Sequence, residues 1–417
     1  MHDWAGWLLL LFSFSIVLMW KSIRDDTKVV LAIWFCLVLH HAVVFLSVYI
    51  PDADGFHVYA YKAAASSETE WFSETYSTFT GAALNYAHSL GLIYRTFGVS
   101  YFLGQELAVL AFVLSCVVLV KLVDLLDLRR FCVGIMLLFG FLPSAVVHRS
   151  VPIREAWQAL FFLLFLYWAI RLWKRPGILI LLFMLMSALG MAFLHYGLTR
   201  YVIYLIVMSL YWGICNRKMG VRWTRYVRLL FAGLLIACVI ILTQKMGVFM
   251  TLEEAVKGGK GIRQTLLAYT EVRTNFRLVL DTSSLLGIVT TFPMIFVEYM
   301  FAPFPWQIGN VKDICAFLES MLRFLLLFFA ISLWRRSSGE VRSCYGFLLI
   351  AVLGIECMWA LGTANWGTAI RHHVLGYSVF VLLGAPRLIL FVRELQFGIF
   401  GRRKVSGELK EQSPHMS

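Results

Sequence analysis

The sequence predicts an all-α integral membrane protein, a polytopic helical bundle of about 11 transmembrane helices. Of its 417 residues, 60% are hydrophobic and only 15% are charged, and the mean hydropathy is +0.78. Soluble domains are closer to one quarter charged. Several apolar runs approach the length of about 20 residues that a helix needs to cross a bilayer. The basic residues gather in short segments between these runs, so the net charge of +13 indicates membrane topology and not nucleic-acid binding.

The apolar runs define the expected crossings and one transmembrane domain over residues 1–400. The crossings are residues 4–20, 29–50, 101–126, 131–147, 156–172, 178–194, 201–215, 229–242, 317–334, 346–361 and 374–392. The first run has an acidic start and no small-residue cleavage site, which favours a span over a cleaved signal. The eight cysteines have no regular spacing, so neither a disulfide framework nor a zinc site is indicated. The polar segment 401–417 is expected to be a disordered cytoplasmic tail.

Basic segments set the expected orientation, with the N-terminus outside and the C-terminus in the cytoplasm. The segments placed inside are Arg129/Arg130, Lys174/Arg175, residues 217–228, Arg335/Arg336 and residues 402–404. One apolar stretch, residues 284–300, would reverse this order downstream if it crossed fully. We therefore predict that it is re-entrant or lies along the interface, with Pro303 and Pro305 marking its exit. The alternative is a twelfth crossing that breaks the positive-inside rule.

Two long polar segments are expected outside, at about residues 51–100 and 243–283. The first contains an expected interfacial helix at residues 83–97. It opens with Asp52, Asp54 and His57, and Gly55 lies between them. Two carboxylates and an imidazole beside a span can bind a cation, accept a proton from a hydroxyl or hydrogen-bond a sugar. A solvated loop that begins with acidic residues remains the structural alternative.

Other ionisable residues fall on the same expected face. They are His148, Arg149, Arg154, Glu155, His195, Arg200, the basic residues of segment 243–283, and Arg371, His372 and His373. The positive-inside rule disfavours Arg154 and Arg371 there, and ionisable residues at costly positions are usually retained for function. Guanidinium groups bind phosphate bidentately, so a phosphate or pyrophosphate ligand is expected.

Structural interpretations remain open for several of these residues. Arg154 and Glu155 can form a local ion pair or complete a helix N-terminus. His195 can be a hydrogen-bonded interfacial histidine, and Arg200 can extend toward lipid headgroups. The basic residues of segment 243–283 can hold anionic lipid.

Two short motifs carry a resemblance to known membrane proteins. Ser150-Val-Pro-Ile-Arg-Glu-Ala-Trp-Gln158 at a span start and Gly367-Thr-Ala-Ile-Arg-His372 between late spans resemble bacterial polysaccharide polymerases and related exopolysaccharide proteins. The architecture, with an acidic first outer segment and an interfacial helix, is similar to the GT-C class of lipid-phosphate-sugar glycosyltransferases. Ala53 separates Asp52 from Asp54, whereas protein mannosyltransferases carry an adjacent acidic pair, and the Trp-Trp-Asp signature of oligosaccharyltransferases is absent. Donor type and metal dependence therefore stay open.

The resemblance implies a glycosyltransferase or polymerase of the bacterial inner membrane that builds a surface polysaccharide such as an exopolysaccharide or O-antigen. Its substrates would be a polyprenyl-linked sugar donor and a saccharide acceptor, with membrane lipids and other assembly proteins as partners and a divalent cation left open. Expected catalytic residues are Asp52, Asp54, His57 and Glu155; expected substrate-binding residues are Arg154, His195, Arg200, Arg371, His372 and His373. No Gly-rich phosphate loop is present, which fits a lipid-linked donor. The alternatives are a transporter or flippase of lipid-linked saccharides and a non-catalytic assembly subunit.

Overall fold

The computed structural model describes residues 3–46, 48–66, 82–216, 274–276, 278, 280–281 and 285–411. Within these ranges the chain is helical and contains no strand, only the isolated bridge between Asn275 and Asn365. The helices are α1 (Trp4–Ile16), α2 (Lys21–Arg24), α3 (Thr27–Phe45), α4 (Pro51–Ala65), α5 (Ala82–Phe97), α6 (Tyr101–Leu125), α7 (Cys132–Phe141), α8 (Pro143–His148), α9 (Glu155–Lys174), α10 (Ile178–Leu194), α11 (Tyr196–Asn216), α14 (Leu285–Phe301), α15 (Val311–Arg336), α16 (Gly339–Gly362) and α17 (Trp366–Glu411), with single 3₁₀ turns at Val17–Met19, Arg129–Phe131 and Pro305–Gln307. The expected all-α class is confirmed for this part of the chain.

Six of the described helices are long and apolar enough to cross a membrane. They are α3, α6, α9, α15, α16 and the Trp366–Gln396 part of α17. Shorter apolar helices cover Trp4–Met19, Ile178–Leu194 and Val289–Phe301. These helices support a multi-pass membrane protein. The count of about 11 crossings stays a prediction, because the expected span 229–242 lies outside the described residues.

The expected span 131–147 is two helices and not one. Helix α7 ends at Phe141, Leu142 is extended, and Pro143 begins α8. Proline has no N–H, so the Phe139 carbonyl loses its helical partner. The Arg149 guanidinium replaces it, with Nη1 donating to Phe139 O at 3.0 Å and Nη2 donating to Val374 O at 3.3 Å.

The sequence suggested that Arg149 belongs to an exposed outer face. In the structure it is instead a buried structural residue. Its exposed fraction is 1%, and its guanidinium carbon lies 4.1 Å from the centre of the Phe139 ring. It joins the broken end of α7 to α17.

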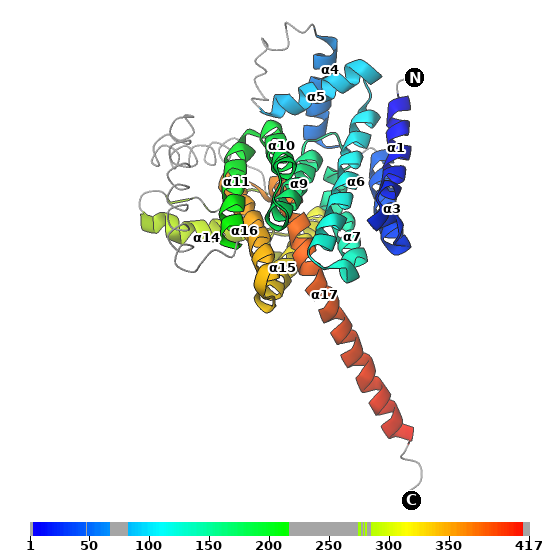
Figure 1. Cartoon of the computed structure of the whole chain (residues 1–417), viewed down its shortest axis with the longest axis vertical. Coiled ribbons are helices and arrows are strands. Elements are labelled where there is room, and N and C mark those ends of the chain that lie inside the picture. The colour runs from blue at the N-terminus through cyan, green and yellow to red at the C-terminus, as the bar shows by residue number, and fades with distance from the viewer. Residues whose placement is uncertain are drawn as a thin grey trace, which may run out of the picture.

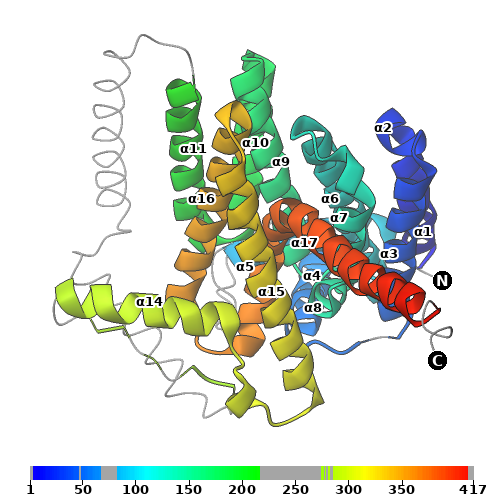
Figure 2. The same ribbon diagram turned by 90° about the horizontal axis from the view of Figure 1, so that it is seen from below.

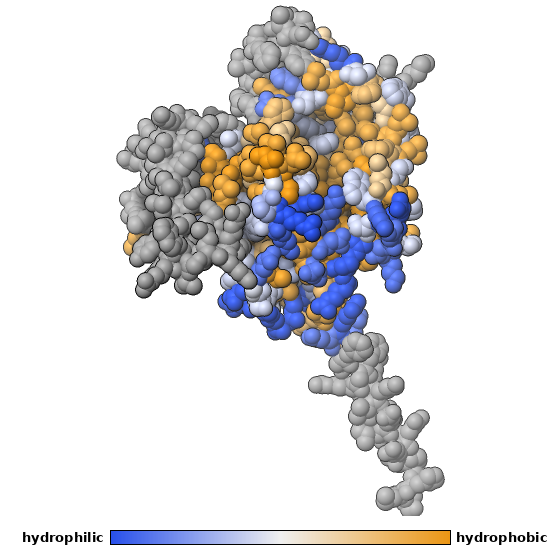
Figure 3. Space-filling view, in the orientation of Figure 1, coloured by the Kyte–Doolittle hydropathy of each residue, from blue (hydrophilic) through white to orange (hydrophobic). Residues whose placement is uncertain are grey.

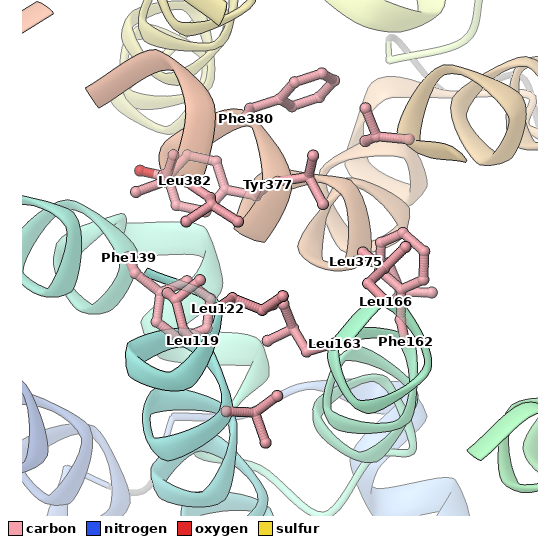
Figure 4. Packing of buried hydrophobic residues seen from close by; sticks show 14 of the residues in the cluster. Leu119, Leu122, Phe139, Phe162, Leu163, Leu166, Leu375, Tyr377, Phe380 and Leu382 are labelled. Carbon is pink, nitrogen blue, oxygen red and sulfur yellow. The ribbon is translucent and has the colours of Figure 1, made fainter. Parts of the chain in front are cut away.

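The core lies where α6, α7 and α9 meet α17 (Figure 4). Leu119 and Leu122 of α6, Phe162 of α9 and Phe380 of α17 are buried there. On the other side of α17, a Cβ at Gly384 would lie 2.3 Å from the Leu326 carbonyl oxygen. Only glycine permits this close approach of α15 and α17, as is common between membrane helices.

Several basic segments meet at one end of the bundle. Arg129 contacts Asp26 at 3.2 Å and Asp124 at 3.1 Å. Lys174 Nζ donates to the Leu125 carbonyl at 2.9 Å and lies 4.0 Å from Glu340. Figure 3 shows hydrophilic residues gathered toward this lower end, near the base of α17, and hydrophobic residues above them. The grouping agrees with a common cytoplasmic side for these segments, which remains the orientation that we propose.

Helix α14 lies across the neighbouring helices in both views (Figures 1 and 2). Before it, Phe276 N–H donates to the Ala364 carbonyl at 2.8 Å, at the end of the bundle opposite the basic segments. At its C-terminus, the Met300 carbonyl accepts a hydrogen bond from Arg323 of α15. The segment before α14 runs back along the helix, with Asp281 N–H donating to Thr291 Oγ1 and Leu278 N–H donating to Glu298 Oε2. Phe276 and the C-terminus of α14 therefore both lie beside the bundle, and a re-entrant or interfacial segment at residues 284–300 remains the arrangement that we propose.

A topology reporter tests this arrangement. A fusion after Gly339 is expected to report cytoplasm, and a fusion at Lys260 is expected to report the outside, because α14 does not reverse the order of crossings in the arrangement that we propose. Lys260 lies outside the described residues. Paired alkaline phosphatase and green fluorescent protein fusions make the measurement. An outside signal at Gly339 would show that residues 284–300 cross fully and would divide the candidate site between two faces.

The C-terminal segment differs from the sequence prediction. Helix α17 is continuous through Glu411, although residues 401–417 were expected to be a disordered tail. Extending an existing helix adds one hydrogen bond for each residue that is fixed, so a polar continuation costs less than a new helix. Residues 412–417 lie outside the described ranges.

Candidate functional site

Helices α4 and α5 cross each other over the end of the bundle opposite the extension of α17 (Figure 1). Small residues permit this crossing: a Cβ at Gly91 of α5 would lie 2.8 Å from Ala63 Cβ and 2.9 Å from the Ala60 carbonyl oxygen of α4. Phe56 of α4 packs edge-on against Tyr86 of α5, with ring centres 5.1 Å apart. The expected interfacial helix at residues 83–97 corresponds to α5.

The acidic stretch that the sequence suggested as a loop is the first turn of α4. Pro51 is at the first helical position, and Asp52 and Asp54 lie in the first turn, where negative charge stabilises the helix dipole. Ala53 and Phe56 face inward and are buried. The helix therefore fixes both carboxylates at its edge, beside the end of the bundle.

Arg371 is the centre of the candidate site. Its Nη1 is paired with Asp52 Oδ2, and its Nε lies 3.1 Å from Glu155 Oε1. The Arg371 and Glu155 side chains are 17% and 4% exposed, while Asp52 is 53% exposed. One guanidinium thus joins the first turn of α4, the first residue of α9 and the second turn of α17. The solvent-facing side of this cluster is the Asp52 side.

Asp54 lies in a second, adjoining group. Tyr101, the first residue of α6, hydrogen-bonds the Asp54 carboxylate. The His57 ring nitrogen Nδ1 is 2.9 Å from the Tyr94 hydroxyl. Burial lowers the pKa of His57, and Asp54 partly offsets that effect. His57 is therefore neutral at pH 7 and can exchange hydrogen bonds with a hydroxyl.

Arg154 and His195 lie on the other side of Glu155. Arg154 Nη1 donates to the Leu194 carbonyl at 3.3 Å, so it caps the C-terminal end of α10. Burial lowers the pKa of Arg154 and the neighbouring Glu155 raises it. Burial, followed by the charge of Arg154, lowers the pKa of His195 to about 3. Arg154 supports the site through α10 and places a cation next to Glu155, while His195 is neutral.

An aromatic stack joins two of the predicted histidines. The His372 ring lies 4.1 Å from the Trp359 ring at an angle of 17°, and its Nδ1 is 2.9 Å from the Thr363 hydroxyl. His195 meets the same Trp359 edge-on, with ring centres 4.8 Å apart. Trp359 of α16 therefore holds His195 and His372 in fixed positions next to the two arginines.

Three of the residues predicted on this face do not join this group. His373 faces the opposite side of α17, where its Nδ1 is 2.7 Å from Glu356 Oε2 and its Nε2 is 3.2 Å from the Tyr299 carbonyl oxygen. Arg200 is exposed in the second turn of α11 and makes no ion pair with a described residue. His148 is also satisfied locally, because its Nδ1 is 2.7 Å from the Ser144 carbonyl oxygen.

The site has opposite charges in close balance. Asp52 and Glu155 pair with Arg371, Arg154 adjoins Glu155, and Asp54 lies in the adjoining group with Tyr101. Among the described residues, no three His, Cys, Asp or Glu side chains gather as a metal-binding group. The basic residues of segment 243–283 lie outside the described residues.

An apolar cavity of about 740 Å³ opens beside this cluster, between α5, α6, α9 and α10. Trp157, Leu194 and Tyr86 line the part nearest the cluster. Leu189 and Phe193 line the other side, and they are 61% and 50% exposed. Exposure of large apolar side chains on a membrane helix indicates a lipid-facing surface. The cavity therefore runs from the lipid side to the residues next to Arg154 and Glu155.

Sequence reasoning missed the aromatic residues of the site. Tyr94, Tyr101 and Trp359 hold His57, Asp54 and the His195–His372 pair in place. Aromatic residues are abundant in this chain, at 16%, so composition alone does not distinguish these three. The available signal was position, because Tyr101 and Trp359 lie at span ends on the expected outer side, where aromatic side chains with a polar atom gather.

Comparisons with known proteins do not extend these observations. No protein-family model matches the chain, and neither the curated proteins nor the solved structures contain a match. What can be inferred about activity therefore comes from the residues and their geometry.

Proposed function

We propose that the chain is a membrane glycosyltransferase or polymerase that transfers a sugar from a polyprenyl-phosphate-linked donor during surface polysaccharide synthesis. The observation that carries the proposal is the pairing of Arg371 with Asp52 and Glu155 next to an apolar cavity. A lipid-linked donor has both a charged phosphate and a long apolar chain. The arginines suit the phosphate, and the cavity suits the chain at its membrane end.

The proposed reaction is attack of an acceptor hydroxyl on the anomeric carbon of the donor sugar. A new carbon–oxygen bond forms while the bond to the lipid (pyro)phosphate breaks, and the phosphate leaves with the electron pair. Asp54 accepts the proton of the attacking hydroxyl. We assign this role to Asp54 and not to Asp52, because Arg371 already engages Asp52. His57 hydrogen-bonds the acceptor.

Arg371 and Arg154 stabilise the negative charge that develops on the leaving phosphate. In the described state Arg371 is held by two carboxylates. An arriving phosphate therefore replaces Asp52, the more exposed partner, while Glu155 keeps the guanidinium oriented. His372 donates a further hydrogen bond from the ring that Trp359 supports.

A transporter or flippase of lipid-linked saccharides is the second candidate, and two buried pairs favour it. His41 lies 3.1 Å from Glu106, and His373 lies 2.7 Å from Glu356, all within helices of the bundle. Ionisable residues inside membrane helices often form proton relays in transporters. The enzyme remains the first proposal, because the Asp54 and Arg371 groups lie together at one end of the bundle.

Lipid-linked glycans from cells that lack this gene test the proposal. A polymerase predicts accumulation of single saccharide units on the outer side of the membrane, where added glycosidases reach them in intact cells. A flippase predicts accumulation of the same units on the inner side, protected from those enzymes. Mass spectrometry before and after glycosidase treatment distinguishes the two, and an unchanged glycan pool would contradict both.

Filling the cavity tests how the donor reaches the site. Leu189→Trp is expected to weaken use of the lipid-linked donor by roughly tenfold, since displacing even two methylene groups of the lipid costs about 1.6 kcal/mol. Leu182→Trp is the matched control, because Leu182 is an exposed residue of α10 and is not among the cavity-lining residues. Apparent KM for donors with long and short prenyl chains is measured. Equal effects of both variants would show that the cavity does not bind the donor.

A further inference from the structure

A second cavity lies at the other end of the bundle, among the basic segments. It measures about 600 Å³ and lies between α11, α15 and α16. Trp212 of α11 and Trp334 of α15 form its walls, and Arg342 and Ser343 of α16 are at its polar end. Trp212 Nε1 donates to Ser343 Oγ at 2.8 Å and to the Ser343 carbonyl at 2.9 Å, which fixes this wall.

The cavity becomes apolar along α16. From Arg342 the lining continues through Gly346 to Ile350 and Leu353. This is one stripe of the helix, with successive lining residues three or four positions apart. From Arg342 to Leu353 the stripe rises about 16 Å at the usual helical rise. A long, narrow cavity with one polar end and one apolar end fits an amphiphile better than a compact polar molecule.

The polar end of the cavity is positively charged. The Arg342 guanidinium carbon lies 5.2 Å from the Trp334 ring centre, and Arg335 and Arg336 follow Trp334 in the last turn of α15. Among the described residues, no carboxylate is paired with Arg342. Glu340, two residues before Arg342, has its Oε1 4.0 Å from Lys174 Nζ instead. The guanidinium of Arg342 thus lies over the Trp334 ring and pairs with no carboxylate of the described residues.

We propose that this cavity binds a phospholipid with an anionic headgroup. Arg342 holds the headgroup phosphate, Arg335 and Arg336 attract its charge, and one acyl chain lies along Gly346, Ile350 and Leu353. Basic pockets between membrane helices are suited to anionic headgroups, and paired tryptophans suit the boundary between headgroup and chain. The site is separate from the Asp52–Arg371 cluster, which lies at the opposite end of the bundle, and the proposal does not depend on the glycosyltransferase assignment.

Native mass spectrometry of the purified full-length protein tests this site with two lipids of identical chains. After delipidation in a neutral detergent, phosphatidylglycerol is expected to bind more tightly than phosphatidylcholine. Arg342→Gln is expected to reduce phosphatidylglycerol binding roughly fivefold, the effect of one cation near an anionic lipid, and to leave phosphatidylcholine unchanged. Arg175→Gln is the matched control, since Arg175 is exposed and is not a lining residue of the cavity.

A second variant tests the apolar part of the cavity. Ile350→Trp places a larger side chain at a lining position that is 37% exposed, and it is expected to weaken binding of both lipids. Equal losses in Arg342→Gln and Arg175→Gln would indicate general surface charge and would overturn the proposal. Equal affinity of the two lipids for the unaltered protein, or no effect of Ile350→Trp on either lipid, would overturn it as well. Lipid-free melting temperatures confirm that each variant is folded.

Discussion

Replacing Arg371 with lysine is expected to lower sugar transfer by about a hundred- to a thousandfold, the usual effect of losing one preorganised donor to a developing anion. Lysine keeps the charge but loses the planar fork that binds two oxygens at once. In the structure the fork faces Asp52 and Glu155 from two different nitrogens, which a single ammonium group cannot reproduce. Transfer activity and binding of a polyprenyl pyrophosphate are measured at matched protein abundance.

Loss of activity in an Arg371 variant must be distinguished from loss of folding, because Glu155 is buried and paired with Arg371. Removing one partner of a buried ion pair leaves an uncompensated charge and destabilises the protein. Arg371→Ala alone is expected to lower protein abundance. The double variant Arg371→Ala with Glu155→Gln removes both charges and is expected to restore abundance but not sugar transfer. Arg200→Lys, at an exposed arginine of α11, is the control. If Arg371→Lys retains full activity, Arg371 is not a phosphate ligand, and Arg154 becomes the next candidate.

Asp54→Asn is expected to reduce transfer by about a hundred- to ten-thousandfold, the usual contribution of a general base. The amide has the same shape as the carboxylate and lies at the edge of α4, so membrane abundance is expected to stay the same. Asp52→Asn is expected to have a smaller effect, because in the proposed reaction the phosphate replaces Asp52 at Arg371 and Asp52 does not accept the proton. Turnover at saturating donor and acceptor is measured for each.

Asp124→Asn is the control for this series, since Asp124 contacts Arg129 at the opposite end of the bundle. It is expected to leave transfer close to that of the unaltered protein. Near-normal polymer from both Asp52→Asn and Asp54→Asn would end the catalytic assignment of α4. A larger loss in Asp52→Asn than in Asp54→Asn would reverse the roles given to the two carboxylates.

The helical class was predictable from the sequence, because long apolar runs have few structural solutions in a membrane. The local form of two segments was also encoded but was not recognised. Pro51 followed by Asp52 and Asp54 is a helix start, yet the stretch was treated as a polar loop. Pro143 within an apolar run marks a break, yet residues 131–147 were treated as one span.

The members of the candidate site were only partly predictable. Asp52, Glu155 and Arg371 were all selected from the sequence, but their pairing joins residues that are 319 positions apart at the widest, and no local pattern specifies such a contact. His373 is a different case. It was grouped with Arg371, although two residues apart on a helix face different sides, and the structure places it against Glu356.

Purified protein in detergent tests the central claim most directly, because detergent micelles have no two compartments between which a substrate could be transported. A polyprenyl-pyrophosphate-linked saccharide and an acceptor are supplied, and both the saccharide length and the released polyprenyl pyrophosphate are measured. We expect one lipid pyrophosphate to be released for each sugar unit added, with both signals lost in Asp54→Asn. Movement of the intact lipid-linked saccharide across proteoliposomes, with no covalent product in either system, would contradict the glycosyltransferase proposal.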